Sequence, residues 1–316
     1  MTAATATNSQ PPMTAARGLG ISLLAVLSRP RWWVLALAAF LARGGLLLLL
    51  LPLIPLPSTA ALANALGPTL VGFVFGGPSV PFLILVGSMV AMTLAWFVLS
   101  GVVGAAIDLA LIRDAAAEDD LEDRVQPVAG GSWRVAAVRW LAHVPTAVAI
   151  AVGLVAVVDA AYRELIRPGD PTVPLAIRVI LQVPVNVGAI VAAWVIGEAV
   201  GGVAERRLAW GSGVARSLGG GVAGLFRPAG LLVLVATNAT LVVAIVGGDL
   251  AIGLAFEHAR RVILDGGAIT DRGLALGFLS VSWIGTAVLV AIAAAWRSAA
   301  WTFEVGRHQR PVDLPA

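Results

Sequence analysis

Cysteine and lysine are both absent from this chain, and only 12% of its 316 residues are charged. Without cysteine the protein has no disulfides, no thiolate metal ligands and no cysteine nucleophile. Hydrophobic residues make up 59% of the chain, compared with roughly 45–50% in soluble domains. A soluble fold of this length could not bury so much apolar surface. The composition therefore indicates an integral membrane protein.

The basic residues are all arginine, 21 in number, and they are dispersed along the chain. The sequence pI is about 10.8, but the formal net charge is only +3. Because the arginines lie in short stretches between apolar runs rather than in one basic patch, we interpret them as topology signals and expect no nucleic-acid partner. The heavy use of Arg, Ala, Gly, Val and Leu is typical of a GC-rich bacterial genome. It predicts a bacterial plasma membrane protein.

Several apolar segments are long enough to cross a bilayer, which requires about 20 residues. The candidates are Trp32 to Ile54, Phe82 to Ile112, Val135 to Val158, Val179 to Val203, Ala229 to Gly247 and Leu274 to Trp301. Backbone groups in lipid must pair within their own segment, so we predict an all-α fold: a polytopic transmembrane helix bundle with about six spans and short interfacial helices. The transmembrane domain is expected over residues 32–302, between an N-terminal tail (1–31) that carries a short interfacial helix and a C-terminal tail (303–316).

The arginines also predict the orientation of the bundle. Arg17, Arg29 and Arg31 precede the first span, whereas residues 56–81 carry no charge. Since cytoplasmic loops carry the excess of arginine, both termini are expected in the cytoplasm. Two connecting stretches with four arginines each are assigned to cytoplasmic loops: Arg113, Arg124, Arg134 and Arg139, then Arg206, Arg207, Arg216 and Arg227.

A short motif recurs where the chain enters the membrane. Leu27-Ser28-Arg29-Pro30 precedes the first span, Leu225-Phe226-Arg227-Pro228 precedes the fifth, and a looser version over 139–145 begins the third. Arginine at the headgroups and proline at the turn suit a surface helix that leads into a span. The motif predicts three helix pairs, each led by a surface helix, although chance similarity in so biased a composition is the alternative. A further interfacial helix is expected over 251–264.

The segment that precedes the fifth span carries a family resemblance. It runs from Glu205-Arg206-Arg207-Leu208 through residues 213–218 to Leu225-Phe226-Arg227-Pro228. This segment resembles the amphipathic helix and arginine turn in the six-helix membrane domain of bacterial glycerophosphodiester phosphodiesterases and of related stand-alone membrane proteins of unassigned function. No His-Arg pair with a nearby Glu-x-Asp pattern is present, so the catalytic domain is missing. The resemblance implies a membrane module without the enzyme.

Arg43 is the clearest candidate for a functional residue inside the membrane. A charged side chain there costs about 2.5–3.5 kcal/mol on insertion scales, and Arg43 lies near the middle of the first span. It either binds an anion or a lipid headgroup, or it anchors the bundle through Asn186, Asn238 or Glu198. We favour the anchoring role because buried ions usually pair.

The fourth span combines polar and small residues. Gln182 and Asn186 lie four residues apart, and Gly197 and Gly201 form a GxxxG spacing that permits close helix packing. Pro184 is expected to kink the helix. These polar residues either line a substrate path or, as we favour, support packing.

Charges in three spans are predicted to meet. Glu198 and Arg297 lie at matched depths in the fourth and sixth spans, and this predicts a salt bridge between them. Asp108 either joins this pair or extends its carboxylate toward the membrane surface by snorkelling. His143 is interpreted as structural, because no second metal ligand occurs at helical spacing from it.

No catalytic motif such as GxSxG, Walker A or HExxH occurs in the chain. We therefore expect a non-enzymatic membrane module without cofactor or metal, which binds membrane lipid or another membrane protein and assists membrane assembly or transport. The alternative is a small-solute or lipid transporter with Arg43, Asn186 and Glu198 along its path.

The topology is testable with reporter fusions. Fusions at Ala65 and Gly267 should report the outer side, and those at Asp120, Ser212 and Val312 the cytoplasm, because the arginine-rich stretches stay inside. A cytoplasmic signal at Gly267 would contradict the arrangement of the last two spans.

Overall fold

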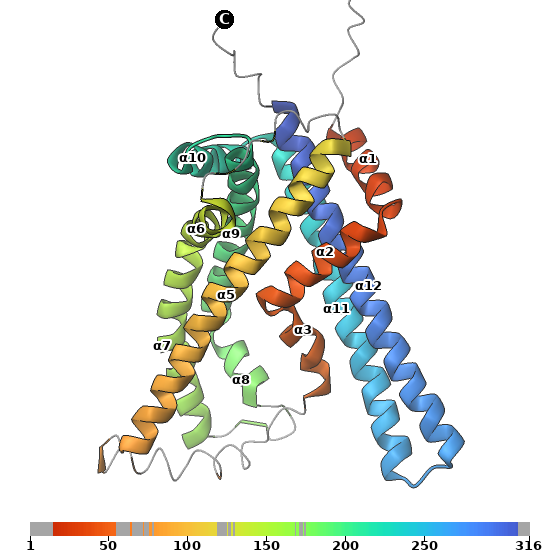
Figure 1. The fold of residues 1–316 in the computed structure, drawn as a ribbon. Coiled ribbons are helices and arrows are strands. Elements are labelled where there is room, and N and C mark those ends of the chain that lie inside the picture. Colours follow the sequence, from red (N-terminus) through yellow and green to blue (C-terminus); the bar gives the residue numbers. More distant parts are fainter. Residues whose placement is uncertain are drawn as a thin grey trace, which may run out of the picture.

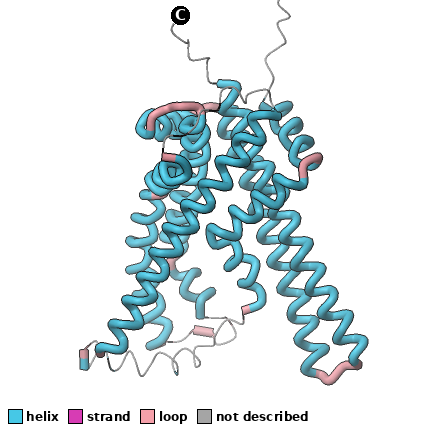
Figure 2. Tube along the Cα trace, in the orientation of Figure 1, coloured by secondary structure: helices cyan, strands magenta, loops and turns pink. Residues whose placement is uncertain are grey.

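The computed structural model describes residues 15–54, 80–118, 131–167 and 175–308, with isolated positions between these ranges. Within them the chain is helical and contains no strand (Figure 2). The residues before 15 and after 308, most of the expected outer loop 57–81 and the second half of the acidic run 114–123 lie outside the described residues. The start of that run continues a helix to Glu118.

The all-α prediction is confirmed, since six helical segments in the described part of the chain are long and apolar enough to cross a membrane. The first is Pro30–Leu53, which comprises α2 (Pro30–Phe40), η1 (Leu41–Gly45), α3 (Leu46–Leu50) and η2 (Leu51–Leu53). The others are α5 (Val80–Glu118), α7 (Val144–Ile166), α9 (Pro184–Ala209), α11 (Pro228–Leu264) and α12 (Ile269–His308). They form a multi-pass helix bundle, and the chain is an integral membrane protein.

Three short helices lie at one end of the bundle, which we call the terminal face because α12 also ends there (Figure 1). They are α1 (Ala15–Leu27), α6 (Gly131–Ala142) and α10 (Val214–Leu225). Each is followed by a membrane-spanning segment with proline in its first turn, at Pro30, Pro145 and Pro228. Proline has no N–H to lose there and its φ suits a helix start. The predicted order of three helix pairs, each led by a short helix, is confirmed.

The core is concentrated toward the terminal face. One cluster joins α5, α6 and α9, a second joins α1, α2, α5 and α12, and a third joins α9, α11 and α12. Trp296 of α12 ties α1 to the bundle, since its Nε1 donates to the carbonyl oxygen of Leu19 and to the hydroxyl of Ser22, both at 3.1 Å. The opposite half of the bundle is open: every residue of α5 from Leu83 to Leu99 is exposed. Lipid tails are as apolar as these side chains, so such exposure is stable in a bilayer.

Two predicted boundaries are wrong. The third span begins at Val144, because residues 131–142 form the separate helix α6 and His143 ends it. Residues 251–264 are not a separate interfacial helix but the last part of α11. In both cases the apolar spacing correctly indicated a helix. The ends of the helices were wrong because the position at which the chain turns depends on packing.

Two spans are broken. The predicted kink at Pro184 is confirmed, because α8 (Leu175–Gln182) ends at Gln182, Val183 is not helical, and α9 starts at the proline. A second break was not predicted: Arg43 and Gly44 leave the helical conformation, and Gly44 has a φ of +97° that favours glycine. The break places Arg43 at a bend within the first span.

The long helices α11 and α12 lie side by side (Figure 1) and depend on one close approach. A Cβ at Gly248 would overlap the side chain of Thr286, whereas a Cβ at the neighbouring Gly247 would meet no atom within 4 Å. Gly248→Ala should therefore lower the free energy of unfolding by about 1–3 kcal/mol through overpacking. Gly247→Ala should leave it unchanged or raise it by up to about 1 kcal/mol through helix propensity. Thermal unfolding in detergent measures both, and equal stability of the two variants would contradict this packing.

Candidate functional site

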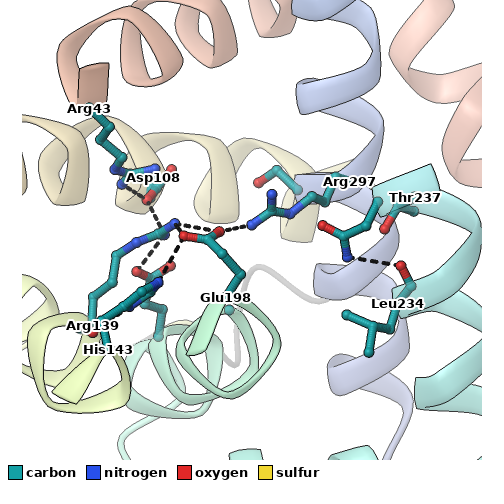
Figure 3. Close-up of polar contacts among 12 residues, drawn as sticks. Arg43, Asp108, Arg139, His143, Glu198, Leu234, Thr237 and Arg297 are labelled. Carbon is teal, nitrogen blue, oxygen red and sulfur yellow. Dashed lines mark hydrogen bonds and ion pairs between the residues drawn. The ribbon is translucent and has the colours of Figure 1, made fainter. Parts of the chain in front are cut away.

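Charged residues from all three helix pairs meet at the same place in the bundle (Figure 3). Asp108 lies on α5, Glu198 on α9 and Arg297 on α12, and each precedes the end of its helix at the terminal face by ten or eleven residues. At 1.5 Å per residue this corresponds to about 15–17 Å. The shared depth lets the three side chains meet within one layer of the bundle.

Arg139, on α6, holds this layer together. Its Nη1 donates to Glu205 Oε1 at 2.9 Å and to Asp108 Oδ2 at 3.3 Å, and its Nη2 donates to both carboxylate oxygens of Glu198 at 2.8 Å. A planar guanidinium with five N–H donors is suited to several carboxylates at once. Burial disfavours the charged form of Arg139, but Glu205 and Asp108 outweigh it and raise the pKa of its guanidinium. The side chain therefore stays positively charged.

Two further arginines flank this centre. Arg43 pairs with Asp108, and Arg297 pairs with Glu198. The predicted salt bridge between the fourth and sixth spans is confirmed, and Asp108 joins the cluster rather than snorkelling. The predicted partners of Arg43 are wrong, because it binds Asp108 in place of Asn186, Asn238 or Glu198. Gly104 of α5 permits this contact, since a Cβ there would lie 2.5 Å from the Nε of Arg43.

His143 completes the cluster at the turn between α6 and α7. Its Nε2 lies 3.1 Å from Glu198 Oε1, and its Nδ1 lies 2.9 Å from the carbonyl oxygen of Arg139. Burial lowers the pKa of His143. The hydrogen bond to the carbonyl oxygen of Arg139 acts to raise this pKa, but its effect is smaller. The imidazole is therefore neutral at neutral pH and adds no charge.

Arg206, on α9, is a fourth arginine with a different environment. Its residue is 4% exposed. In the described part of the chain its hydrogen bonds go to neutral oxygens: Gly202 O at 2.6 Å, Ser298 O and Oγ at 2.8 and 3.0 Å, and Thr302 Oγ1 at 3.1 Å. Four guanidinium groups thus share three carboxylates, those of Asp108, Glu198 and Glu205. Among the described residues the cluster carries one positive charge in excess.

A cavity of about 340 Å³ adjoins this cluster. The four arginines and three carboxylates line it. Its apolar lining residues come mainly from α2, α3, α9 and α11 and include Phe40, Leu48, Trp194, Leu241 and Ile245. The cavity therefore combines a cationic surface with a hydrocarbon-like one.

The remaining predicted residues lie elsewhere. Gln182 donates to Glu164 of α7, which also pairs with Arg178 at 3.3 Å. Asn238 donates to the carbonyl oxygen of Leu234 on its own helix at 2.8 Å. Asn186 is half-buried and faces Gly153 of α7. None of the three lines the cavity.

Sequence reasoning missed Arg139, Glu205 and Arg206 as site residues. The two arginines were assigned to cytoplasmic loops as topology signals, and Glu205 was named only in the segment that carries the family resemblance. A signal was available for Glu205 and Arg206, because the chain contains no turn residue between Val203 and Trp210 that would end the fourth helix before them. Arg139 and His143 lie four residues apart and so share one helix face. No group of three His, Cys, Asp or Glu side chains arranged to hold a metal ion occurs among the described residues. The arrangement is suited to the recognition of an anion.

The cluster predicts a large effect of Arg139. Arg139→Gln should lower the free energy of unfolding by about 3–5 kcal/mol, because it leaves buried carboxylates without their cation. Glu205, which is 1% exposed, should suffer most. Glu205→Gln in the Arg139→Gln background should therefore recover part of the loss. Chemical or thermal unfolding in detergent measures all three forms.

The control for this prediction is an exposed ion pair. Arg163 pairs with Asp159 on α7 with both side chains more than half exposed, so Arg163→Gln should cost less than about 1 kcal/mol. Equal losses for Arg139→Gln and Arg163→Gln would show that the cluster contributes nothing special to the fold.

Comparisons with known proteins give no match: no family model, no curated protein and no solved structure is similar to this chain. The resemblance to the membrane domain of glycerophosphodiester phosphodiesterases stays a prediction.

Proposed function

We propose that this protein is a non-enzymatic membrane module that binds an acidic lipid, or a related anionic amphiphile, in the cavity beside the charged cluster. The observation that carries the proposal is that one cavity within the bundle is lined both by a charged cluster with excess positive charge and by large apolar side chains. A volume of about 340 Å³ lies at the lower end of the range for small-molecule sites. It suits a headgroup and the first part of a lipid chain.

The charge balance favours an anionic ligand over a neutral one. An uncompensated charge in a low-dielectric region is costly, and Arg206 is held by neutral oxygens alone in the described part of the chain. One of the two N–H donors on its Nη1 is not used in these bonds. The Nε of Arg43 is likewise buried without a hydrogen-bond partner among the described residues. Both arginines line the cavity, so an anionic headgroup would receive two unused donors.

A lipid or solute transporter is the second candidate, and the broken first span supports it. Arg43 and Gly44 interrupt the helix where it lines the cavity, and a second span is broken before Pro184. Transporters commonly build their binding sites from such discontinuous helices near the middle of the membrane. The same binding site would then alternate between the two sides.

We further propose that the terminal face is cytoplasmic and that the membrane is the bacterial plasma membrane. The arginine-rich segments that connect the helix pairs support this orientation. The resemblance of residues 205–228 to a phosphodiesterase membrane domain supports a role as a module that acts with another membrane protein or with lipid.

The proposal predicts that Arg206 governs binding of acidic lipid. Full-length protein in nanodiscs of phosphatidylcholine should gain thermal stability when phosphatidylglycerol is added, because the anion neutralises the excess charge. Arg206→Gln should weaken the apparent affinity for phosphatidylglycerol on the order of tenfold, which corresponds to the loss of one charge-assisted hydrogen bond.

Arg260→Gln serves as the matched control, because Arg260 is exposed and pairs with Glu257 on α11 away from the cavity. Equal stabilisation of all three proteins by phosphatidylglycerol would refute binding in the cavity. Movement of fluorescent phosphatidylglycerol between leaflets of proteoliposomes separates the two candidates. Movement that is lost in Arg206→Gln supports a transporter, whereas binding without movement supports a static module.

A further inference from the structure

A second, smaller cavity of about 90 Å³ lies at the terminal face, where α9, α10, α11 and α12 meet. Its charged residues are Arg207 at the end of α9, Arg227 at the turn into α11, and Glu304 on α12. Three glycines are among its lining residues: Gly220 and Gly224 of α10 and Gly230 of α11. This cavity is separate from the central one, and no charged residue is shared between them.

The side chain of Arg207 packs against α10 at Gly220. A Cβ at Gly220 would overlap the Nε, Cζ and Nη1 atoms of Arg207, so glycine at this position is what allows the guanidinium to occupy the cavity. The Nε of Arg207 is buried and has no hydrogen-bond partner among the described residues. A buried donor without a partner is costly, and it points to an acceptor that enters from outside the chain.

The cavity carries more positive than negative charge. Arg207 and Arg227 line it together with one carboxylate, Glu304, and Arg216 of α10 lies near enough for its charge to act on Arg207. The equivalent turn before the first span is balanced differently, because Arg29 pairs there with Glu118 of α5. The turn at Arg227 therefore presents a cationic surface that the turn at Arg29 does not.

The helix above this cavity has the features of a membrane-surface helix. α10 lies across the ends of the long helices at the terminal face (Figure 1). It buries Ser217 and Gly221 in the bundle, where a Cβ at Gly221 would lie 2.6 Å from the carbonyl oxygen of Val200. It exposes Val222, and Phe226, which directly follows the helix, is 83% exposed. Apolar side chains that project from a surface helix place it at the depth of the headgroups.

From these features we infer that Arg207 and Arg227 form a peripheral binding site for a phosphate group at the junction of α9, α10 and α11. Guanidinium groups bind phosphate through charge-assisted hydrogen bonds. The phosphate group comes from a lipid headgroup of the adjacent leaflet or from free phosphate in solution, and the two sources share the same chemistry. The inference is independent of the proposed ligand of the central cavity.

Two neighbouring glycines provide a matched test. Gly220→Ala displaces the guanidinium of Arg207, whereas a Cβ at Gly219 meets no atom within 4 Å, so Gly219→Ala changes helix propensity alone. Thermal stability of the full-length protein in detergent is measured against three probes: inorganic phosphate, dioctanoyl phosphatidylglycerol and dioctanoylglycerol, which lacks phosphate. The double variant Arg207→Gln/Arg227→Gln provides a second route to the same loss if Gly220→Ala folds poorly.

The expected result is a loss of apparent affinity for phosphatidylglycerol on the order of tenfold in Gly220→Ala and in the double arginine variant, with none in Gly219→Ala. The same loss of affinity for phosphatidylglycerol should occur when these substitutions are made in the Arg206→Gln background. Binding at this site is thereby distinguished from binding in the central cavity. Protection of wild type by inorganic phosphate that is lost in the same variants assigns the site to free phosphate. Protection by dioctanoylglycerol equal to that by phosphatidylglycerol, or equal protection of all variants, overturns the inference.

Discussion

The contact between Arg139 and three carboxylates is the interaction on which the rest of this structure depends. Asp108, Glu198 and Glu205 come from two long helices, α5 and α9. Their charges could not remain inside a bundle without a shared cation. Arg139 reaches them from α6, a short helix that leads into the second helix pair. The cluster thus fixes the positions of a short helix and two spans together, and the pair formed by Glu198 and Arg297 extends it to α12.

The same requirement explains the shape of the cavity. Arg43 meets Asp108 from the place where the first span is broken by Arg43 and Gly44. That span then lines the cavity beside the charged layer with apolar residues such as Phe40 and Leu48. A charged cluster with one cation in excess, in a cavity that is also lined by apolar side chains, is suited to holding an acidic amphiphile within the membrane. The cluster is thus both the element that stabilises the bundle and the proposed binding surface.

The sequence predicted the membrane fold and part of the site, since these follow from local physical rules. Segment length and hydropathy revealed the six spans, proline at Pro30 and Pro228 marked the entry turns, and matched depth predicted the contact of Glu198 with Arg297. Arg139 and Arg206 were missed because an arginine near the end of an apolar run is equally compatible with a loop and with a buried ion pair. Whether such an arginine lies in a loop or in a buried ion pair depends on which helix packs against it. The partner of Arg43 depends on helix packing in the same way. The sequence of one helix does not show which other helix packs against it. The three polar residues Gln182, Asn186 and Asn238 were, like Glu198, selected as polar side chains within predicted spans. In the structure they face other neighbours.

The central claim is that the cavity holds an anionic amphiphile next to Arg206. Native mass spectrometry of the full-length protein, extracted from its membrane in mild detergent, tests this most directly. The account predicts that wild type retains one acidic lipid or other anionic amphiphile at a collision energy that removes detergent, and that Arg206→Gln loses it while Arg260→Gln keeps it. Retention of zwitterionic lipid alone, or of the same acidic lipid by wild type and Arg206→Gln, would contradict it.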